Sequence, residues 1–500
     1  MKYDVIIIGG GITGAGTARD CALRGLSVLL LEKGGIGNGA SGRNHGLLHS
    51  GARYAMSDPV SAGECAGENS ILRQIAPHCI DECGGLFITL PEDEKAGYGA
   101  SYRTKFLGAC VRAGIQAKEI SVQEALKMEP SVNPELKGAV VVNDASVDPM
   151  KLCISNILDA KKHGAVILYF NEVTELVREG DRITGVRVLD LNTSQTREYE
   201  GSVIINAAGI WGAGIAAMAG ISINMYPAKG SLLVFGHRVN RMVINRCRPA
   251  SNGDILVPGD SVTILGTTSS RVTQSECDNI AADASEVDML MDEAVKLCPE
   301  LKDTRVIRAY SGVRPLVGDD SDASGRSVSR GIVCLDHEER DGVAGFITIT
   351  GGKMITYRKM AQDATDLACS KLHLTRECTT YVKALPDPGL PRHVEAGLGT
   401  PVCECECVSR EDLETVIGLM QINTLSELRK HTRLGMGPCQ GTHCIRVAAE
   451  ILARHRGCSV EEVEGEYLQE RWKGMRPVCW GDTIRQMELM QKIYKEGMSI

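Results

Sequence analysis

The first 54 residues constrain the fold of this chain more than any other stretch. Residues 2–8 read as a buried β-strand, residues 9–14 follow with the spacing G-x-G-x-x-G, and a helix is expected from 15 to about 23. A second apolar strand at 26–31 ends at Glu32. A lone glycine motif is weak evidence, but strand, glycine turn, helix, strand and acid occur here in the order of a dinucleotide-binding βαβ unit.

Each part of this unit has a physical role. Gly9 permits the tight turn, Gly11 lets the backbone approach a pyrophosphate, and Gly14 lets the helix pack on the strand. The N-terminus of the helix offers unpaired N–H groups and a positive dipole end to the phosphates. Glu32 can accept hydrogen bonds from both hydroxyls of a ribose and would repel a 2′-phosphate.

Size and composition narrow the remaining possibilities. A chain of 500 residues is too long for one ordinary core, so two or three domains are expected. The net charge is −8 and no long basic run occurs, so nucleic acid is not an expected partner. No apolar run approaches the roughly 18 residues that span a bilayer. The first strand starts directly after Met1, which leaves no room for a secretory signal.

The rest of the chain predicts an α/β fold of several domains. Residues 202–209 read as a buried strand ending in small residues, at the kind of strand end where doubly wound sheets bind ligands. The stretch from 226 to 301 is β-rich and predicts a second, substrate-binding domain. We expect dinucleotide-binding parts at about 1–55, 140–215 and 305–375, substrate-domain parts at about 56–139 and 216–304, a linker at 376–400, a cysteine-rich domain at 401–455 and a helical tail at 456–500.

Three further stretches are candidates for ligand contacts. Residues 34–46 are rich in glycine and small polar residues, and as a loop they could run beside a diphosphate. Residues 47–54 contain a histidine, an arginine and a tyrosine, for which a hydrophilic turn is the alternative reading. The glycine pair at 351–352 precedes a helix that is expected from Lys353 to about Leu372, and this suits the second end of the cofactor.

Four cations stand beside the segments expected near the cofactor: Arg53, Arg314, Arg330 and Lys353. Singly, each is most often a surface charge. Together they match the needs of a phosphorylated substrate, because guanidinium groups bind phosphate oxygens in bidentate fashion. Tyr54 could add a hydroxyl donor.

Five longer motifs, at 8–16, 18–25, 42–54, 309–316 and 350–358, carry a resemblance to a known family. The chain resembles the FAD-dependent glycerol-3-phosphate dehydrogenases in their anaerobic bacterial form, from Val5 to about Leu372 and on into the cysteine module. The resemblance implies an FAD-binding Rossmann-like domain of the D-amino-acid oxidase or glutathione reductase type. It also implies oxidation of sn-glycerol 3-phosphate to dihydroxyacetone phosphate, with hydride passing to flavin N5 and electrons passing through an iron–sulfur centre towards quinone.

The same resemblance implies the site residues. His49 is the candidate base, because neutral imidazole has a suitable pKa, with a hydrogen-bonding role as the alternative. Lys353 could stabilise the developing ketone oxygen, and Arg314 completes the catalytic set. The implied substrate residues are His49, Arg53, Tyr54, Arg314, Arg330 and Lys353. The implied cofactor residues are Gly9, Gly11, Ile12, Thr13, Gly14, Glu32, Lys33, Ala40, Ser41, Asn44, His45, Gly46, Leu48, Val173, Ala208, Gly209, Gly312, Gly352, Lys353 and Met354.

Five of the nineteen cysteines fall within residues 403–444, as C-x-C and C-x4-C about thirty residues apart with one extra thiol. Thiolates suit zinc or iron–sulfur, and the C-x-C half disfavours zinc, whose pairs are usually C-x2-4-C. An empty structural module is the third possibility. The module resembles the bacterioferritin-associated ferredoxin-like domain, which implies a 2Fe–2S cluster on Cys403, Cys405, Cys439 and Cys444 and leaves Cys407 as the extra thiol.

Other functions remain open at this point. Another FAD enzyme of the same fold, acting on a 2-hydroxy acid or an amino acid, would also use arginines but usually fewer. A glycerophosphate oxidase would have no use for the cysteine module, and an electron-transfer or scaffold protein with a degenerate site is the non-enzymatic alternative. By resemblance, companion electron-transfer subunits would link a cytoplasmic chain to quinone at the inner face of the cell membrane.

Overall fold

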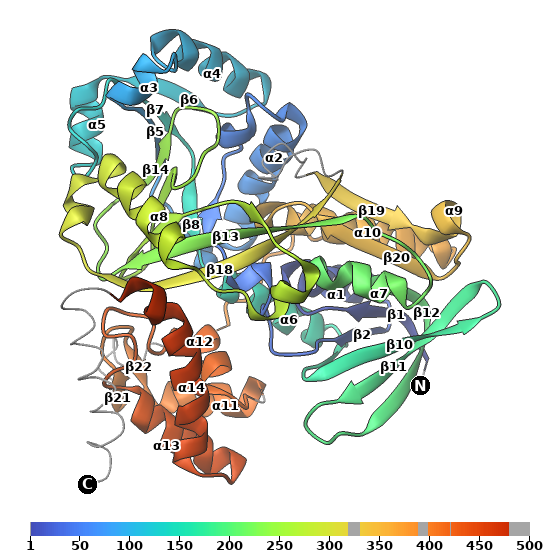
Figure 1. Cartoon of the computed structure of the whole chain (residues 1–500). Coiled ribbons are helices and arrows are strands. Elements are labelled where there is room, and N and C mark those ends of the chain that lie inside the picture. Colours follow the sequence, from blue (N-terminus) through green and yellow to red (C-terminus); the bar gives the residue numbers. More distant parts are fainter. Residues whose placement is uncertain (1, 319–330, 389–398, 421, 480–500) are drawn as a thin grey trace.

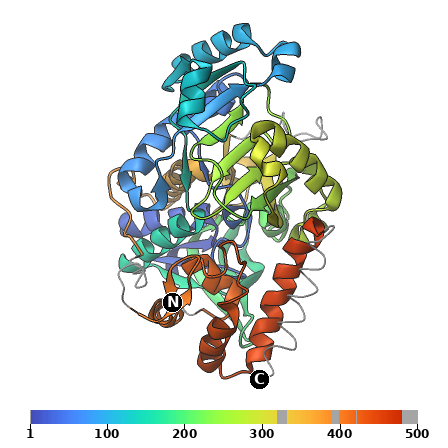
Figure 2. The same cartoon turned by 90° about the vertical axis from the view of Figure 1, so that its left-hand side faces the viewer.

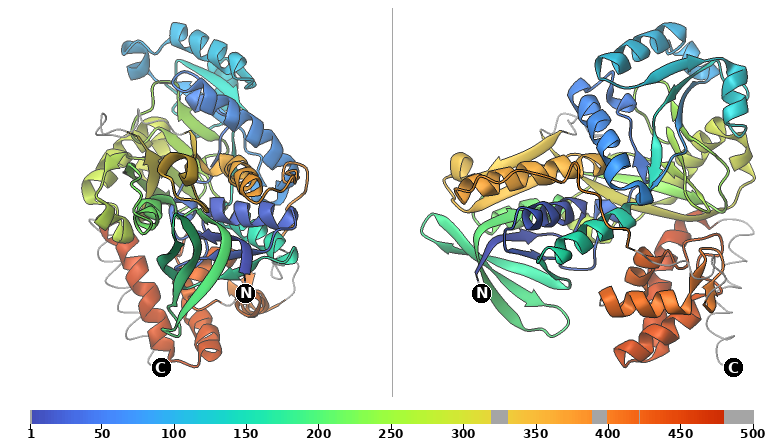
Figure 3. Two further views of the ribbon diagram at one scale, coloured as in Figure 1. Left: turned by 90° about the vertical axis from the view of Figure 1, so that its right-hand side faces the viewer. Right: turned by 180° about the vertical axis from the view of Figure 1, so that it is seen from behind.

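The computed structural model describes residues 2–318, 331–388, 399–420 and 422–479 (Figure 1). Arg330, one of the implied substrate residues, lies outside the described residues. The chain forms two large sheets, with a helical module packed beneath them (Figure 1). The right-hand view of Figure 3 shows the second sheet and its helices above, with the orange and red module below.

The first sheet has eight strands, and β1 (Lys2–Ile8) lies in its interior. It pairs in parallel with β2 (Val28–Leu31) and β12 (Thr196–Asn206). Next to β2 lies β9 (Val166–Leu168), and next to β12 lie β11 (Arg182–Asp190) and then β10 (Asn171–Glu179). Strand β20 (Phe346–Gly351) also pairs with β12, and β19 (Ile332–Asp336) pairs with β20. The predicted βαβ unit is therefore confirmed.

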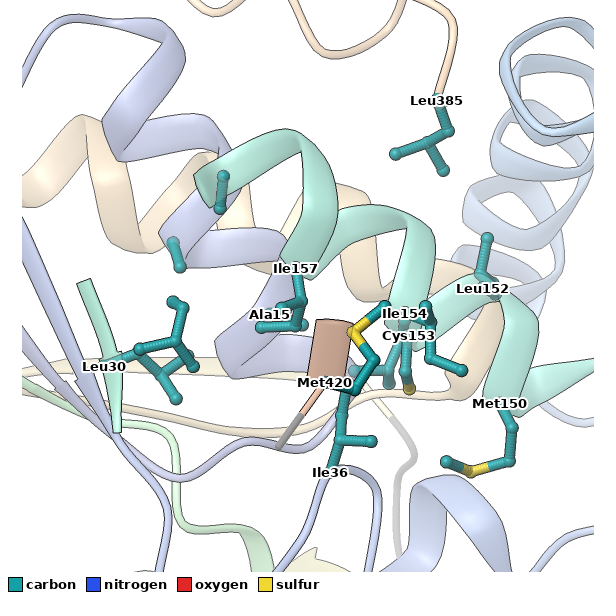
Figure 4. Packing of buried hydrophobic residues seen from close by; sticks show 14 of the residues in the cluster. Ala15, Leu30, Ile36, Met150, Leu152, Cys153, Ile154, Ile157, Leu385 and Met420 are labelled. Carbon is teal, nitrogen blue, oxygen red and sulfur yellow. The ribbon is translucent and has the colours of Figure 1, made fainter. Parts of the chain in front are cut away.

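Both faces of this sheet are covered, which explains why β1 is a continuous apolar run. Val5 and Ile7 point into the core shared with α1 (Ile12–Leu23), while Ile6 and Ile8 point into the core beneath the β10–β11 hairpin. Helix α1 begins inside the glycine motif, earlier than predicted. It packs between α6 (Pro149–Lys162) and α10 (Tyr357–Lys371), and Figure 4 shows Ala15 of α1 against Ile157 of α6.

The second sheet has nine strands, and five of them, β13 to β17, come from the stretch at 226–301 that the sequence predicted to be β-rich. Its strands are β5 (Gly85–Thr89), β6 (Ala117–Ile120), β7 (Gly138–Val142), β13 (Met225–Phe235), β14 (Val243–Arg246), β15 (Ile255–Pro258), β16 (Thr263–Gly266), β17 (Ser270–Arg271) and β18 (Val306–Val317). Around it lie α2 (Pro59–Ile75), α3 (Pro91–Lys95), α4 (Ala100–Arg112), α5 (Val122–Met128) and α8 (Ala284–Leu297). A small sheet of β3 (Leu47–Leu48), β4 (Ile80–Asp81) and β8 (Ala145–Val147) is also present. Helices α7 (Gly212–Ala217) and α9 (His337–Asp341) pack on the first sheet, against β12, β19 and β20.

One expected boundary is wrong. We expected the chain to return to the dinucleotide-binding sheet at about 305, but β18 pairs antiparallel with β13 along its whole length, from Val306 opposite Phe235 to Val317 opposite Met225. The return happens only at β19 and β20. An apolar strand pattern cannot say which of two sheets a strand joins, because pairing is a long-range choice. The other expected domain limits stay predictions.

The C-terminal module begins with β21 (Pro401–Cys403) and β22 (Val408–Ser409). Helices α11 (Arg410–Met420), α12 (Leu425–Thr432), α13 (Ile445–Arg456) and α14 (Val460–Met475) follow and pack on one another. Helix α12 also contacts α6, and α14 contacts β18. Figure 2 shows α14 running from the base of the module towards α8. The module thus touches the second sheet directly, and it touches helix α6, which covers the first sheet. No described helix is both long and apolar enough to cross a membrane.

Candidate active site

A cavity of about 1610 Å³ lies at the carboxyl ends of β1, β2 and β12, where Ile8, Leu31 and Ala207 form part of its wall. Parallel α/β sheets bind ligands at this edge. The opposite wall comes from the second sheet, through Gly230 of β13 and Arg314 of β18. The cavity is therefore shared by the dinucleotide-binding sheet and the β-rich part.

The glycine turn has the geometry that its sequence predicts. Gly9 has a φ of 110°, and a Cβ there would lie 2.7 Å from the carbonyl oxygen of Ala207. A Cβ on Gly14 would lie only 1.9 Å from the carbonyl oxygen of Gly9, so this glycine allows α1 to close on the strand. Ser41 accepts a hydrogen bond of 2.9 Å from the N–H of Ile12, at the first turn of α1.

Glu32 lies at the end of β2 with its carboxylate fixed by backbone donors. It accepts hydrogen bonds from the N–H groups of Gly10 (2.5 Å) and Gly34 (2.7 Å). Burial raises the pKa of the Glu32 carboxyl, while these hydrogen bonds and the nearby Lys430 act in the opposite direction. Lys430 belongs to α12 of the C-terminal module, a neighbour that the sequence did not predict.

Most of the implied cofactor residues line the cavity, but three do not. Gly14 packs against the turn behind the wall, Leu48 is fully buried in the core, and Gly46 turns against the carbonyl oxygen of Val147. The implied cofactor residues on the wall are Gly9, Gly11, Ile12, Thr13, Glu32, Lys33, Ala40, Ser41, Asn44, His45, Val173, Ala208, Gly209, Gly312, Gly352, Lys353 and Met354.

Arg53 lines this cavity, and one of its terminal guanidinium nitrogens has no hydrogen-bond partner among the described residues. Its Nη2 donates to Asp254 at 2.9 Å, whereas its Nη1 is buried and has no hydrogen-bond partner among the described residues. Burial acts to raise the pKa of Asp254, but Arg53 and Arg248 hold it below its ordinary value. A buried guanidinium donor without a partner is costly unless an anion satisfies it.

Arg314 enters the same cavity from β18 and is held by the loop after β16. It donates to the carbonyl oxygens of Thr268 (3.2 Å) and Lys229 (3.3 Å) and hydrogen-bonds Thr267. Gly230 makes room for it, because a Cβ there would lie 2.5 Å from Arg314 Nη2. Neither Gly230 nor Thr267 was a sequence candidate, since a glycine or threonine within a strand region gives no local signal.

Lys353, Tyr54 and His49 form a second cluster on the wall. The Nζ of Lys353 lies 4.7 Å from the centre of the Tyr54 ring, and the ring centres of His49 and Tyr54 are 5.5 Å apart. Asn69 of α2 holds this loop, because its side chain donates to the carbonyl oxygen of His49 at 2.9 Å. The substrate candidates that the structure describes, including Arg53, Arg314 and Lys353, therefore line one cavity.

Four of the five module cysteines lie near one another. Cys403 is hydrogen-bonded to Cys444, Cys405 is hydrogen-bonded to Cys439, and the two pairs interact electrostatically. The thiol of Cys407 instead faces the carbonyl oxygen of Glu404 at 3.8 Å. Among the described residues, no group of three or more His, Cys, Asp or Glu side chains has the spacing of a single bound metal ion. Two thiol pairs suit a two-iron cluster, which uses four thiolates, better than one tetrahedral ion.

Comparison with known proteins gives the class first. A family model described as FAD dependent oxidoreductase matches residues 4–358, and one described as a BFD-like 2Fe–2S binding domain matches residues 401–454. The fold, the dinucleotide turn and these matches define an FAD-dependent oxidoreductase that carries a 2Fe–2S module. The expected FAD and 2Fe–2S cofactors are confirmed.

Individual relatives narrow this class. The A subunit of the anaerobic glycerol-3-phosphate dehydrogenase from Escherichia coli (strain K12) is 51% identical and covers 99% of this chain and 96% of its own length. The protein of the same name from Haemophilus influenzae is 48% identical and covers 100% of this chain and 94% of its own. The chain therefore belongs to the family of anaerobic glycerol-3-phosphate dehydrogenase A subunits.

A solved structure supports the fold. The glycerol-3-phosphate dehydrogenase from Bacillus halodurans, complexed with FAD, has a TM-score of 0.69 to this chain and covers 96% of both chains. Its sequence is 19% identical, so this likeness bears on the fold alone.

Proposed function

We propose that this chain oxidises sn-glycerol 3-phosphate to dihydroxyacetone phosphate with bound FAD and passes the electrons to the 2Fe–2S centre of its C-terminal module. The observation that carries the proposal is that Arg53, Arg314 and Lys353 line one cavity, next to the dinucleotide turn. The Nη1 of Arg53 is buried and has no hydrogen-bond partner among the described residues, which favours an anion nearby. Relatives named glycerol-3-phosphate dehydrogenase over the full length of the chain support the choice of substrate.

The residues present fit FAD. The start of α1 and the loop at Ala40–Ser41 line the cavity where the diphosphate would lie near a helix N-terminus, and Glu32 would offer a carboxylate to the adenosine ribose. Gly352 and Met354 line the cavity beside the expected isoalloxazine end. When bound, FAD supplies the two-electron acceptor.

The chain's own side chains would bind and orient the substrate. Arg53 and Arg314 would bind the phosphate, and the hydrogen bonds that hold each guanidinium fix the orientation in advance. His49 would accept the proton of the C2 hydroxyl, and Lys353 would stabilise the oxygen that becomes the ketone. Tyr54 lies near both His49 and Lys353, and its ring would keep the His49 imidazole and the Lys353 ammonium group in place.

In the module we propose Cys403, Cys405, Cys439 and Cys444 as the ligands of the cluster, because they form the two thiol pairs. We leave Cys407 out because its thiol contacts the carbonyl oxygen of Glu404 instead. Two-electron chemistry at a flavin must be followed by one-electron steps, which an iron–sulfur centre can perform. The word subunit in the relatives' names supports companion subunits. We propose that these carry the electrons to quinone and hold the chain at the inner face of the cell membrane.

The test is anaerobic titration of the purified, FAD-loaded protein with four compounds: sn-glycerol 3-phosphate, glycerol, a 2-hydroxy acid and an amino acid. The proposal predicts that only sn-glycerol 3-phosphate bleaches the flavin absorbance at micromolar to millimolar concentration. Bleaching by the 2-hydroxy acid or the amino acid would favour the rival enzyme classes. No bleaching by any of the four would favour an electron-transfer or scaffold protein.

A further inference from the structure

The C-terminal module contacts the loop that follows Glu32, and this loop is hydrogen-bonded to the glycine turn. The contact has a consequence for the cofactor. Residues 34–38 form this loop, which we call the ribose-side loop. Its Gly37 N–H donates to the carbonyl oxygen of Gly10 at 3.1 Å, and its Gly34 N–H donates to Glu32. Asn38, the last residue of the loop, lines the cavity. The loop therefore holds together the two parts of the site that would face the adenosine end of FAD.

Helix α12 lies directly on this loop. Lys430 donates to Asn38 Oδ1 and, at 2.6 Å, to Glu427 Oε1. The carboxyl group of Glu427 covers Gly35 so closely that a Cβ on Gly35 would lie 1.8 Å from Glu427 Oε2. Both side chains are largely buried, with 17% of Lys430 and 7% of Glu427 exposed. Ile36 of the loop and Met420 of α11, both labelled in Figure 4, are buried in the same apolar cluster, so apolar burial accompanies the polar contacts.

These contacts join two distant parts of the chain, because Asn38 and Lys430 are 392 residues apart in sequence. Lys430 also acts electrostatically on Glu32, where its positive charge favours the ionised carboxylate that a ribose hydroxyl needs as acceptor. Removing Lys430 would take away its hydrogen bond to the loop and a positive charge that offsets the effect of Glu427 on Glu32.

We propose that Lys430, with Glu427, is a positioning residue for the FAD site, so that FAD retention depends on the docked C-terminal module. Lys430 acts on the loop and on Glu32 and has no proposed contact with the reacting atoms. The inference concerns FAD binding and holds whichever substrate the enzyme oxidises.

The test measures the Kd of FAD for the full-length, cluster-loaded protein by flavin fluorescence. Lys430→Met removes the charge and the hydrogen bond at similar length, and we expect the Kd to rise about fivefold, because a partly exposed hydrogen bond to a charged group contributes modestly. Arg454→Met is the matched control, since Arg454 is an exposed cation on α13 of the same module, and its Kd should equal that of the wild type.

A second variant tests the same contact from the other side. Asn38→Ala leaves the module untouched and should raise the Kd to a similar extent, and the double variant should be little worse than either single one. Iron content is measured in every variant, so that loss of the module is not mistaken for loss of the contact. An unchanged Kd in Lys430→Met, or full additivity of the two substitutions, would overturn the proposal. If Lys430→Met loses its iron, the Kd of Asn38→Ala decides, and an unchanged value there overturns it too.

Discussion

At the scale of single residues, Asp254 decides where Arg53 points. This carboxylate is fully buried and accepts hydrogen bonds from Arg53, from Arg248 (2.7 Å) and from the N–H of Ser251 (2.6 Å). With Nη2 bound to Asp254, Arg53 is held on the cavity wall, and its buried Nη1 has no hydrogen-bond partner among the described residues. An aspartate in front of an apolar strand has no local signature, so the sequence did not single it out.

Asp254→Asn tests this role while keeping the size of the side chain. The amide can no longer pair with two guanidinium groups, so Arg53 is held less firmly. We expect KM for sn-glycerol 3-phosphate to rise about tenfold, equivalent to about 1.4 kcal/mol, with a much smaller change in kcat. Asp288→Asn, on the exposed side of α8, is the control and should leave both constants unchanged. A fall in kcat with an unchanged KM would contradict the positioning role.

At the scale of elements, β18 and α12 connect the site to the module. Strand β18 carries Gly312 and Arg314 on the cavity wall, and Arg308 near its other end pairs with Glu470 of α14 at 3.4 Å. A Cβ on Gly474 of α14 would lie 2.7 Å from Arg308 Nε, so this glycine lets the helix approach the strand. Substrate wall and module therefore share one strand.

Helix α12 also contains a buried histidine, His431, from which we expect a pH dependence of the module's stability. Burial lowers the pKa of His431 to about 3, so the folded module keeps the ring neutral, while the unfolded chain takes up a proton near the ordinary value of 6.5. Because the folded pKa is the lower one, the stability is complete above pH 6.5 and is lost as pH falls towards 3.

We expect the free energy of opening of α12 to fall by about 1 kcal/mol between pH 7 and pH 5.5, measured by native-state hydrogen exchange. His431→Leu removes the titrating group and should remove this difference. The same fall in the leucine variant would show that another group is responsible.

The helices and strands themselves were largely predictable, because the residues within each segment determine strands, helix starts and the glycine turn. The turn at Gly9–Gly14, helix α6 after Asp148 and the hairpin of β10 and β11 all form where their patterns predict. Two features were not predictable, because both depend on contacts between distant segments. These are the pairing of β18 with β13 and the packing of α12 on residues 34–38. For the same reason the sequence suggested Arg53, Arg314 and Lys353 but missed Asp254, Thr267 and Gly230, which hold or accommodate them.

At the scale of the whole molecule, Arg433 ties the cysteine loop to the oxidoreductase part. Its guanidinium lies 2.8 Å from Glu406 of the cysteine loop, 3.0 Å from Asp260 before β16 and 3.6 Å from Asp148 at the start of α6. Glu406 also accepts a hydrogen bond of 2.6 Å from Ser261. Three carboxylates from three segments therefore meet at one side chain, and repulsion among them would follow its removal.

Arg433→Met should loosen this junction. Asp148 and Asp260 are partly exposed and Glu406 is buried, so we expect a loss on the order of 1–2 kcal/mol, seen as roughly tenfold faster hydrogen exchange in the cysteine loop. Reduction of the flavin by substrate should be unchanged, whereas electron delivery to an artificial one-electron acceptor should slow. Equal exchange rates in Arg433→Met and in the exposed control Arg454→Met would contradict the assignment.

In the proposed function, Arg53 from the turn after β3 and Arg314 from β18 bind the phosphate of a three-carbon substrate beside FAD, and Arg53 offers the most direct test. The measurement is the concentration of sn-glycerol 3-phosphate that half-bleaches bound FAD without oxygen, in the wild type, in Arg53→Met and in the exposed control Arg112→Met. We predict that the control matches the wild type and that Arg53→Met needs about 100-fold more substrate, the loss expected for a buried charge-assisted contact. Equal half-bleaching concentrations in Arg53→Met and the wild type would contradict the account.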